Sequence, residues 1–278
     1  MSHPIHPEAV SVNPERVGEL LRQAARECVM PHYRQVEGAH KPDGSIVTAA
    51  DIACQRFLAQ ALAAEYPDIV LFGEEMEAGE QHRVLRAGRG RALWFLDPID
   101  GTSNFAAGIP IFGISLALVV QGEARYGWVC DPLRDELFFA ARGQGAWVNG
   151  ERLRRKAGPA LGRAVSVIDL KRLPQPLLQR LAVDMPFHSQ RSFGSAVIEW
   201  CWLAAGRYHF YIHGGQQLWD WAAGLLILQE AGGVAQTLQG GELDLTRHAS
   251  QSVLACLDPQ LLQAWREWLG EGAASMGQ

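Results

Sequence analysis

The stretch Ala92–Phe105 limits the fold more than any other part of the chain. It begins with a short apolar run, which is too short for a surface helix and is typical of a buried strand. Asp97 and Asp100 follow directly, and Pro98 and Gly101 predict a turn at this point. Because strand C-termini are the usual place for ligand sites in layered α/β structures, we expect both carboxylates to lie at such a site.

The pentapeptide Asp-Pro-Ile-Asp-Gly also has a purely structural interpretation, because proline and Asp-Gly are common turn formers. A calcium loop of the EF-hand type is excluded, since Ile99 and Gly101 occupy positions that would have to supply oxygen ligands. Residues 102–104 then supply hydroxyl and amide side chains of the kind that cap helices. A helix that starts there would offer unpaired backbone N–H groups to an anion.

Composition excludes several classes of function. The chain has 278 residues, of which 48% are hydrophobic and 20% charged, so it can form one large domain or two packed subdomains. The net charge of -5 gives no electrostatic footprint for nucleic acid, and the basic run 152–156 is interpreted as a solvated loop. We therefore expect no nucleic-acid partner.

The cysteines and the apolar segments indicate the cellular compartment of the protein. Five cysteines, widely spaced and without a Cys-x-x-Cys pair, favour reduced thiols in the cytosol over disulfides or a zinc site. Residues 1–10 lack the basic region and apolar run of a signal peptide, and residues 109–120 are too few to span a bilayer. We expect a cytoplasmic protein without a membrane partner.

Apolar periodicity and turn residues predict alternating helices and strands. The expected helices start near Asn13, Thr48, Leu177, Ser195, Trp219 and Asp258. The expected strands are 69–72, 92–96, 114–120, 124–130, 136–140, 145–148, 164–168, 207–212 and 252–257. The four strands between 114 and 148 indicate an antiparallel meander, whereas the polar segment 81–91 predicts a mobile loop and residues 213–215 a second loop.

Several further positions have both a structural and a functional interpretation. Glu74 follows a buried strand and Gly73, an arrangement that solubility explains poorly. Asp51, three residues after Thr48, has the spacing of a capping box, and Asp220 stands where capping and the helix dipole favour an acid. The step Gly194-Ser195-Ala196 is interpreted as an N-cap or as a close approach of backbone to a ligand. Such all-oxygen donors select Mg²⁺, Mn²⁺ or Ca²⁺ over zinc.

Three ordered motifs, at 73–75, 97–105 and 219–224, resemble the signature set of the inositol monophosphatase family of Mg²⁺-dependent, lithium-sensitive phosphatases. The resemblance runs from about Asn13 to Leu269. It implies an α+β fold, the layered αβαβα sandwich shared with fructose-1,6-bisphosphatase. Residues 1–148 would form a subdomain with most metal ligands, and residues 149–278 a second one with Asp220 and the loop on the alcohol side. It also implies a homodimer and two or three Mg²⁺ ions, with Mn²⁺ able to replace them.

The resemblance implies three sets of site residues. The metal ligands are Glu74, Asp97, the carbonyl of Ile99, Asp100 and Asp220. The catalytic set, which positions and deprotonates the attacking water, is Glu74, Thr102 and Asp51. The substrate-binding set is Asp100, Gly101, Thr102, Ser103, Gly194, Ser195, Ala196, His213 and Asp220. Lys41 and Glu75 match the supporting residues of the family more loosely.

The chemistry of phosphate esters is consistent with these sets. Phosphate monoesters hydrolyse extremely slowly without catalysis, and two ions about 4 Å apart can bind the attacking and leaving oxygens. We expect a phosphomonoesterase for a small phosphorylated polyol or sugar, with inositol monophosphate as the first expectation. Fructose 1,6-bisphosphate, histidinol phosphate and adenosine 3′,5′-bisphosphate are the alternatives. A regulatory protein that retains the fold is the non-enzymatic alternative; its mark would be a lost metal ligand, and none is lost.

One position departs from the inositol-cleaving members of the family. They carry a glutamate seven residues before the Trp-Asp aspartate, and His213 stands at that position here. A neutral imidazole presents one donor and one acceptor, whereas a carboxylate only accepts, so a polyol should bind less well. If His213 faces the alcohol, a leaving group with acceptors or negative charge should be preferred over myo-inositol 1-phosphate. Two alternatives remain open: the loop 213–217 shifts the alignment, or His213 is an ordinary loop residue.

Overall fold

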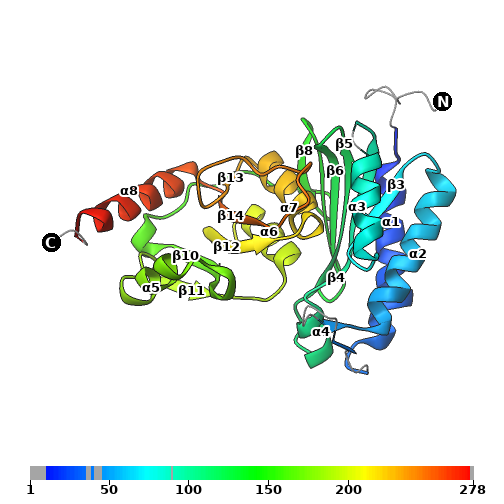
Figure 1. The fold of residues 1–278 in the computed structure, drawn as a ribbon, viewed down its shortest axis with the longest axis horizontal. Coiled ribbons are helices and arrows are strands. Elements are labelled where there is room, and N and C mark those ends of the chain that lie inside the picture. The colour runs from blue at the N-terminus through cyan, green and yellow to red at the C-terminus, as the bar shows by residue number, and fades with distance from the viewer. Residues whose placement is uncertain (1–10, 36–38, 41–45, 89, 276–278) are drawn as a thin grey trace.

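The computed structural model describes residues 11–35, 39–40, 46–88 and 90–275. The expectations for residues 1–10 and for Lys41 lie outside the described residues. Helices and sheets alternate in layers, as Figure 1 shows, and this confirms the layered α+β fold that the sequence predicts. Within the described residues, no helix combines the length and the apolar character needed to cross a membrane.

The larger sheet has seven strands in sequential order, with only β3 and β4 parallel. Its strands are β3 (Val70–Gly73), β4 (Ala92–Asp100), β5 (Gly113–Val120), β6 (Glu123–Asp131), β7 (Glu136–Ala141), β8 (Gly145–Val148) and β9 (Glu151–Arg152). Each pair from β4 to β9 is antiparallel, so the predicted meander is confirmed.

The smaller sheet has the strand order β11-β10-β12-β14-β13. Its strands are β10 (Val165–Asp169), β11 (Ser189–Arg191), β12 (Phe210–Gln216), β13 (Val234–Gln236) and β14 (Gln251–Cys256). Strands β10, β11 and β12 are parallel, whereas β14 is antiparallel to β12 and to β13. A separate pair, β1 (Ala39–His40) and β2 (Ile46–Val47), precedes α2.

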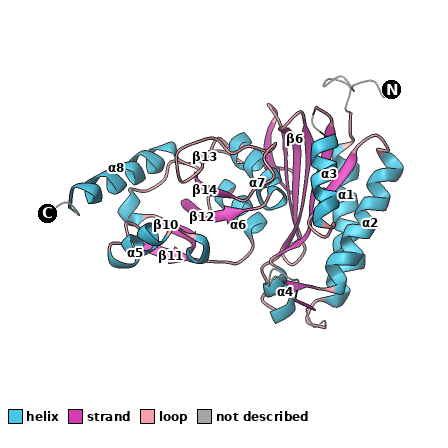
Figure 2. Cartoon of the chain, viewed as in Figure 1, coloured by secondary structure: helices cyan, strands magenta, loops and turns pink. Residues whose placement is uncertain are grey.

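Alternate residues of the smaller sheet enter two different cores. Tyr211 packs with helices α6 (Ala196–Ala204) and α7 (Leu218–Glu230). Phe210 and Ile212 pack with residues of α5 (Gln175–Val183) and α8 (Pro259–Ser275) on the opposite face. The larger sheet also has α6 and α7 on one face, and it has α1 (Pro14–Ala24) and α2 (Ala49–Glu65) on the other. Figure 2 shows α6 and α7 between the strands of the two sheets, where they form the central layer.

Strand β4 continues through Pro98, so the turn predicted at Pro98 is wrong. The pairing shifts between Asp97, opposite Ser115, and Asp100, opposite Gly113, which inserts one extra residue into β4. In a regular strand, residues 97 and 100 would point to opposite faces, because side chains alternate. The bulge turns both carboxylates toward the same side, and proline is tolerated at such irregular positions.

Two predicted loops are regular structure instead. Segment 81–91 was expected to be a mobile loop, but α3 (Ala78–Ala87) covers most of it. Its buried stripe is limited to Gln81, with Val84 and Leu85 packed against the central core, so the polar composition hid the helix. His213 lies in β12, paired with Val253, rather than in a loop. The sequence predicted none of the short strands β9, β11 and β13.

Helix α7 is buried along nearly its whole length, and its contact with α6 depends on Gly224. A Cβ atom at this position would lie 2.4 Å from the Cβ atom of Trp200. We expect Gly224→Ala to lower the free energy of unfolding by about 1–3 kcal/mol, because overpacking forces the two helices apart. Chemical denaturation measures the change.

The matched control is Gly270→Ala, in α8, where a Cβ atom would contact nothing within 4 Å. This variant should be neutral or slightly more stable, since alanine is the better helix former. Equal stability of the wild type and Gly224→Ala would contradict the close packing of α6 on α7.

Candidate active site

A pocket of about 830 Å³ lies where β4, α4 (Thr102–Ala107), α6, α7 and the ends of β10 and β12 meet. All residues of the predicted metal-ligating and substrate-binding sets line this pocket. Of the metal-ligating, catalytic and substrate-binding sets, Asp51 is the one residue that does not line it, and the more loosely matched Glu75 does not line it either. The fold thus brings together motifs from both sheets.

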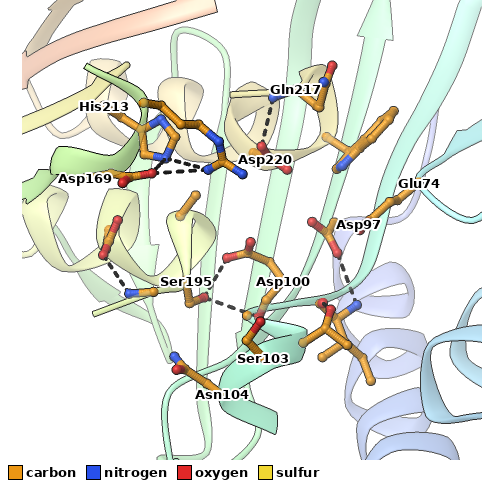
Figure 3. A pocket seen from close by; sticks show the side chains of 18 of the residues that line it. Glu74, Asp97, Asp100, Ser103, Asn104, Asp169, Ser195, His213, Gln217 and Asp220 are labelled. Carbon is orange, nitrogen blue, oxygen red and sulfur yellow. Dashed lines mark hydrogen bonds and ion pairs between the residues drawn. The ribbon is translucent and has the colours of Figure 1, made fainter. Parts of the chain in front are cut away.

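Three carboxylates form the centre of the pocket. Asp97, Asp100 and Asp220 each offer one oxygen, and these oxygens lie within 4.8 Å of one another. Figure 3 shows the three side chains directed into a common space, with Glu74 beside Asp97. Glu74 follows β3, whose parallel pairing with β4 places the ends of the two strands next to each other.

Structural hydrogen bonds hold these carboxylates in place. Asp100 Oδ2 accepts from the Ser195 hydroxyl at 2.6 Å and from the Val197 N–H at 2.9 Å. Asp220 Oδ2 accepts from the Gln217 N–H at 2.8 Å, which closes a capping box at the start of α7. Asp220 therefore has a capping role and also lines the pocket, because a carboxylate has two oxygens.

Burial makes the ionised forms of the three aspartates unfavourable, and repulsion from neighbouring carboxylates adds to this effect at Asp97 and Asp220. Burial, with Glu74, Asp100 and Asp220 nearby, raises the pKa of Asp97 well above its usual range. Burial and the Asp100 charge do the same to the pKa of Asp220. A bound cation would relieve this repulsion, and clustered carboxylate oxygens suit hard divalent ions. The residues present therefore fit a divalent metal ion.

Thr102 connects this centre to Asp51. Its hydroxyl lies 3.0 Å from the Ile99 carbonyl oxygen and 3.4 Å from Asp51 Oδ1. Because a hydroxyl has one hydrogen, it donates to one acceptor at a time, and the bond to Ile99 is the shorter one. Asp51 Oδ2 accepts from both the backbone N–H and the hydroxyl of Thr48. Asp51 thus completes a capping box and also reaches Thr102.

Ser195 occupies the N-cap position of α6, one of the two interpretations that the sequence allowed. Its side chain makes no cap hydrogen bond and donates to Asp100 instead. The same loop is fixed by Asn104, whose Nδ2 donates to the carbonyls of Ile111 and Phe193 at 2.8 and 2.7 Å. Gly101 has a φ of +87°, and a Cβ atom there would lie 3.1 Å from the Ser195 Cβ atom. Glycine is required where these two segments approach each other.

His213 lines the pocket, but both of its ring nitrogens are used within the protein. Nδ1 accepts from the Gly215 N–H at 3.1 Å, so the proton lies on Nε2. Nε2 then donates to Asp169 Oδ2 at 2.9 Å. His213 therefore does not present the donor and acceptor to a substrate that the sequence led us to expect.

Sequence reasoning missed several polar residues that line the pocket, among them Asp169, Arg172 and Glu199. Asp169 and Arg172 directly follow the predicted strand 164–168, and their position at a strand's C-terminal end could have identified them. Glu199 lies on the first turn of α6 among apolar neighbours, where only its burial distinguishes it.

Glu199 binds the loop that carries Ser195. Its Oε1 accepts from the N–H groups of Phe193 and Gly194 at 2.8 and 3.1 Å. Burial raises the pKa of Glu199 from 4.5 to about 7, although these hydrogen bonds oppose the shift. The carboxyl group is thus a buried titratable group beside the acidic centre.

Comparison with known proteins identifies the class and then the family. The layered fold with an acidic pocket is that of a metal-dependent phosphatase, and residues 4–269 match the Inositol monophosphatase family. The chain belongs to this family, whose members hydrolyse phosphoric monoesters.

Two relatives and two solved structures illustrate the similarity. The chain is 35% identical to a Nus factor SuhB of Pasteurella multocida over 74% of this chain and 77% of the relative. It is 34% identical to a fructose-1,6-bisphosphatase/inositol-1-monophosphatase of Thermotoga maritima, over 81% and 82% of the two chains. A Thermotoga maritima inositol monophosphatase structure has a TM-score of 0.76 at 30% identity, covering 92% of this chain and 98% of that one. The SaIMPase-II structure with bound inositol monophosphate has a TM-score of 0.74 at 27% identity, with 90% of each chain covered.

The raised pKa of Glu199 predicts a pH dependence of stability. A folded-state pKa of about 7, above the ordinary 4.5, gives stability that is complete below pH 4.5 and is lost as the pH rises through 7. Relative to Glu199→Gln, whose amide oxygen can still accept both N–H groups, the wild type should lose about 3 kcal/mol of unfolding free energy across this range.

Denaturation at several pH values, without divalent cations, measures this difference between the two proteins. Parallel pH profiles for the wild type and Glu199→Gln would contradict the assignment.

Proposed function

We propose that this chain is a Mg²⁺-dependent phosphomonoesterase. The observation that carries the proposal is the set of three aspartate oxygens within 4.8 Å of one another, in a pocket that both sheets enclose. The complete set of carboxylates favours an enzyme over a regulatory protein that merely retains the fold. A Mg²⁺-dependent phosphate-release assay on a panel of esters tests the proposal.

The ligands divide into two overlapping sets. Glu74, Asp97 and the Ile99 carbonyl would hold one Mg²⁺, and Asp97, Asp100 and Asp220 the second. A further, weaker ion near Glu74 and replacement of Mg²⁺ by Mn²⁺ are part of the proposal. When bound, the ions neutralise phosphoryl charge and make a water nucleophilic near neutral pH.

The protein groups position the reactants. The N–H groups of Gly101 and Thr102, at the start of α4, would bind phosphate oxygens, and Ser103 lines the same side of the pocket. Glu74 and Thr102, backed by Asp51, would orient the attacking water and accept its proton. This role is supported by the approach of the Thr102 hydroxyl to both Ile99 and Asp51.

The substrate class is a small phosphorylated polyol or sugar, with inositol monophosphate as the first candidate. One structural relative was solved with inositol monophosphate, and one sequence relative is described as a fructose-1,6-bisphosphatase/inositol-1-monophosphatase. Fructose 1,6-bisphosphate is therefore the second candidate. Histidinol phosphate and adenosine 3′,5′-bisphosphate remain in the panel. The loop Gly194–Ala196 would contact the alcohol portion.

The family resemblance supports further expectations about the whole protein. We propose a cytoplasmic homodimer that millimolar lithium inhibits, an order of magnitude set by the weak binding of monovalent ions to carboxylates. We also propose subdomains 1–148 and 149–278. Their division is supported by the two sheets, since β3–β8 precede residue 149 and β10–β14 follow it, although β9, the edge strand of the larger sheet, lies just after residue 149.

Loss of a proposed metal ligand should abolish catalysis but not folding. Asp97→Asn and Asp220→Asn keep an oxygen for their backbone hydrogen bonds, from Ile99 and Gln217. Substitution of a residue that hydrogen-bonds a metal ligand typically lowers metal affinity or activity by about 10- to 100-fold. Substitution of the ligand itself should therefore lower turnover by at least that factor and weaken Mg²⁺ binding. Steady-state kinetics over a Mg²⁺ titration measures both effects.

Asp244→Asn is the control, because this carboxylate binds Thr246 outside the pocket. It should retain full activity. Near-normal turnover in a folded Asp97→Asn or Asp220→Asn protein would refute the metal assignment.

Substitution of Thr102 distinguishes an effect on the positioning of the attacking water from an effect on metal binding. Thr102→Ala should reduce kcat by about 10²- to 10⁴-fold, the usual contribution of a positioned acid–base group, with a smaller change in the Mg²⁺ requirement. Thr102→Ser keeps the hydroxyl and should keep most of the activity. A loss confined to Mg²⁺ affinity, with normal kcat at saturating Mg²⁺, would contradict the role.

A further inference from the structure

Glu74 enters the pocket from a turn that directly follows β3. Its N–H donates to the Leu96 carbonyl oxygen of β4 at 3.1 Å. The Glu75 N–H donates to Gln55 Oε1 of α2 at 3.0 Å. The Glu74 side chain is hydrogen-bonded to Asp97, whose pKa it raises. The direction of the backbone at Glu74 therefore decides where this carboxyl group lies relative to the aspartates.

The side chain of Gln81 completes this turn. Gln81 lies on α3, seven residues after Glu74, and is only 7% exposed. Its Nε2 lies 2.9 Å from the Gly73 carbonyl oxygen and 3.2 Å from the Glu74 carbonyl oxygen. Both partners only accept hydrogen bonds, and an amide nitrogen carries two N–H groups, so Gln81 can donate to both at once. One buried side chain thus fixes the peptide groups on either side of the Glu74 Cα atom.

Removal of the Gln81 amide would take a donor from both carbonyl oxygens. The Gly73 oxygen also accepts from the Met76 N–H, but at 3.4 Å this bond is long. Buried backbone acceptors that lose a donor are costly, so the peptide groups would rotate toward another one. Because both peptide groups adjoin the Glu74 Cα atom, their rotation changes the φ and ψ angles of Glu74 and displaces its side chain.

Helix α3 has other contacts that fix its own position. Val84 and Leu85 of this helix pack against the central core. His82 contacts His248, in the segment that precedes β14, with the ring centroids 4.5 Å apart. Figure 1 shows α3 alongside β3. These contacts hold the helix in place without the amide, so substitution of Gln81 should act on the turn alone.

We propose that Gln81 is a positioning residue for Glu74. It acts through Glu74 on the divalent ion that Glu74, Asp97 and the Ile99 carbonyl would hold, so the inference rests on the proposed function. The structural hydrogen bonds to the three aspartates come from β4 and from the starts of α6 and α7 rather than from α3. Gln81 therefore acts on one of the two proposed ions and not on the ion that the three aspartates would hold.

The test measures Mn²⁺ binding without substrate, by electron paramagnetic resonance of the free ion. Glu74→Gln and Asp220→Asn first identify which dissociation constant belongs to which set of ligands. Gln81→Met removes the donor and keeps a side chain of similar length. It should weaken the site that Glu74→Gln weakens by about tenfold or more, the usual effect of losing a residue that orients a metal ligand. The site that Asp220→Asn weakens should change by less than about twofold, as expected for an independent site.

Gln81→Asn keeps the amide on a shorter side chain that cannot reach the turn, so it should show the same selective loss. The control is Gln263→Met in α8, where the amide donates to Glu267 Oε1 on the surface at 2.9 Å. It should change neither dissociation constant. An equal loss at both sites in the two Gln81 variants would reveal a general structural role, and this result overturns the proposal. Unchanged dissociation constants in both variants also overturn it.

Amide hydrogen exchange in the metal-free protein separates this inference from the proposed function. In Gln81→Met the N–H groups of Glu74 and Glu75 should exchange about tenfold faster than in the wild type, because opening the turn no longer breaks the bonds from Gln81. The amides of α3 should keep their protection. If the protein hydrolyses no ester, the proposed function fails, but a selective loss of Mn²⁺ binding with faster exchange in the turn would still support the inference. Unchanged exchange at both amides would overturn it.

Discussion

The close approach of three carboxylates, of which Asp97 is buried and Asp100 and Asp220 are partly buried, is the constraint on which the site depends. Asp97, Asp100 and Asp220 lie close together; burial raises the pKa of each, and the charges of neighbouring carboxylates raise the pKa of Asp97 and Asp220 further. Such an arrangement is unfavourable unless other bonds enforce it. Here the bulge in β4 fixes two of the aspartates, and the capping box of α7 fixes the third. These structural bonds hold the three carboxylates close together against their unfavourable environment before any ion binds.

Several carboxylates around the pocket have two roles each. Asp51 and Asp220 each use one oxygen in a capping box, while Asp51 also reaches Thr102 and Asp220 also belongs to the acidic centre. Asp169 is held by His213 and in turn holds Arg172. The structural and functional interpretations of these residues therefore do not compete. A carboxylate tied through one oxygen has few orientations left for the other, which is what a preorganised site requires.

Much of the fold could be predicted from local pattern, because apolar periodicity identified the meander, β10 and most helices. The motif residues were also found, since Asp97, Asp100 and Asp220 lie beside strand ends and helix starts. Register and burial could not be predicted from one sequence. The bulge at Pro98, the inclusion of His213 in β12 and the pairing of His213 with Asp169 all depend on neighbouring strands. Glu199 was missed because nothing local indicates that its carboxyl group turns back to the loop at Phe193.

The central claim is that the three aspartates form a site for divalent cations in the folded chain. Anomalous diffraction from crystals grown with Mn²⁺ and inorganic phosphate tests it most directly. The account predicts Mn²⁺ peaks bounded by Asp97, Asp100 and Asp220, with phosphate density beside Gly101. A well-ordered pocket with no anomalous peak at these carboxylates at saturating Mn²⁺, or with Mn²⁺ bound only elsewhere, would contradict it.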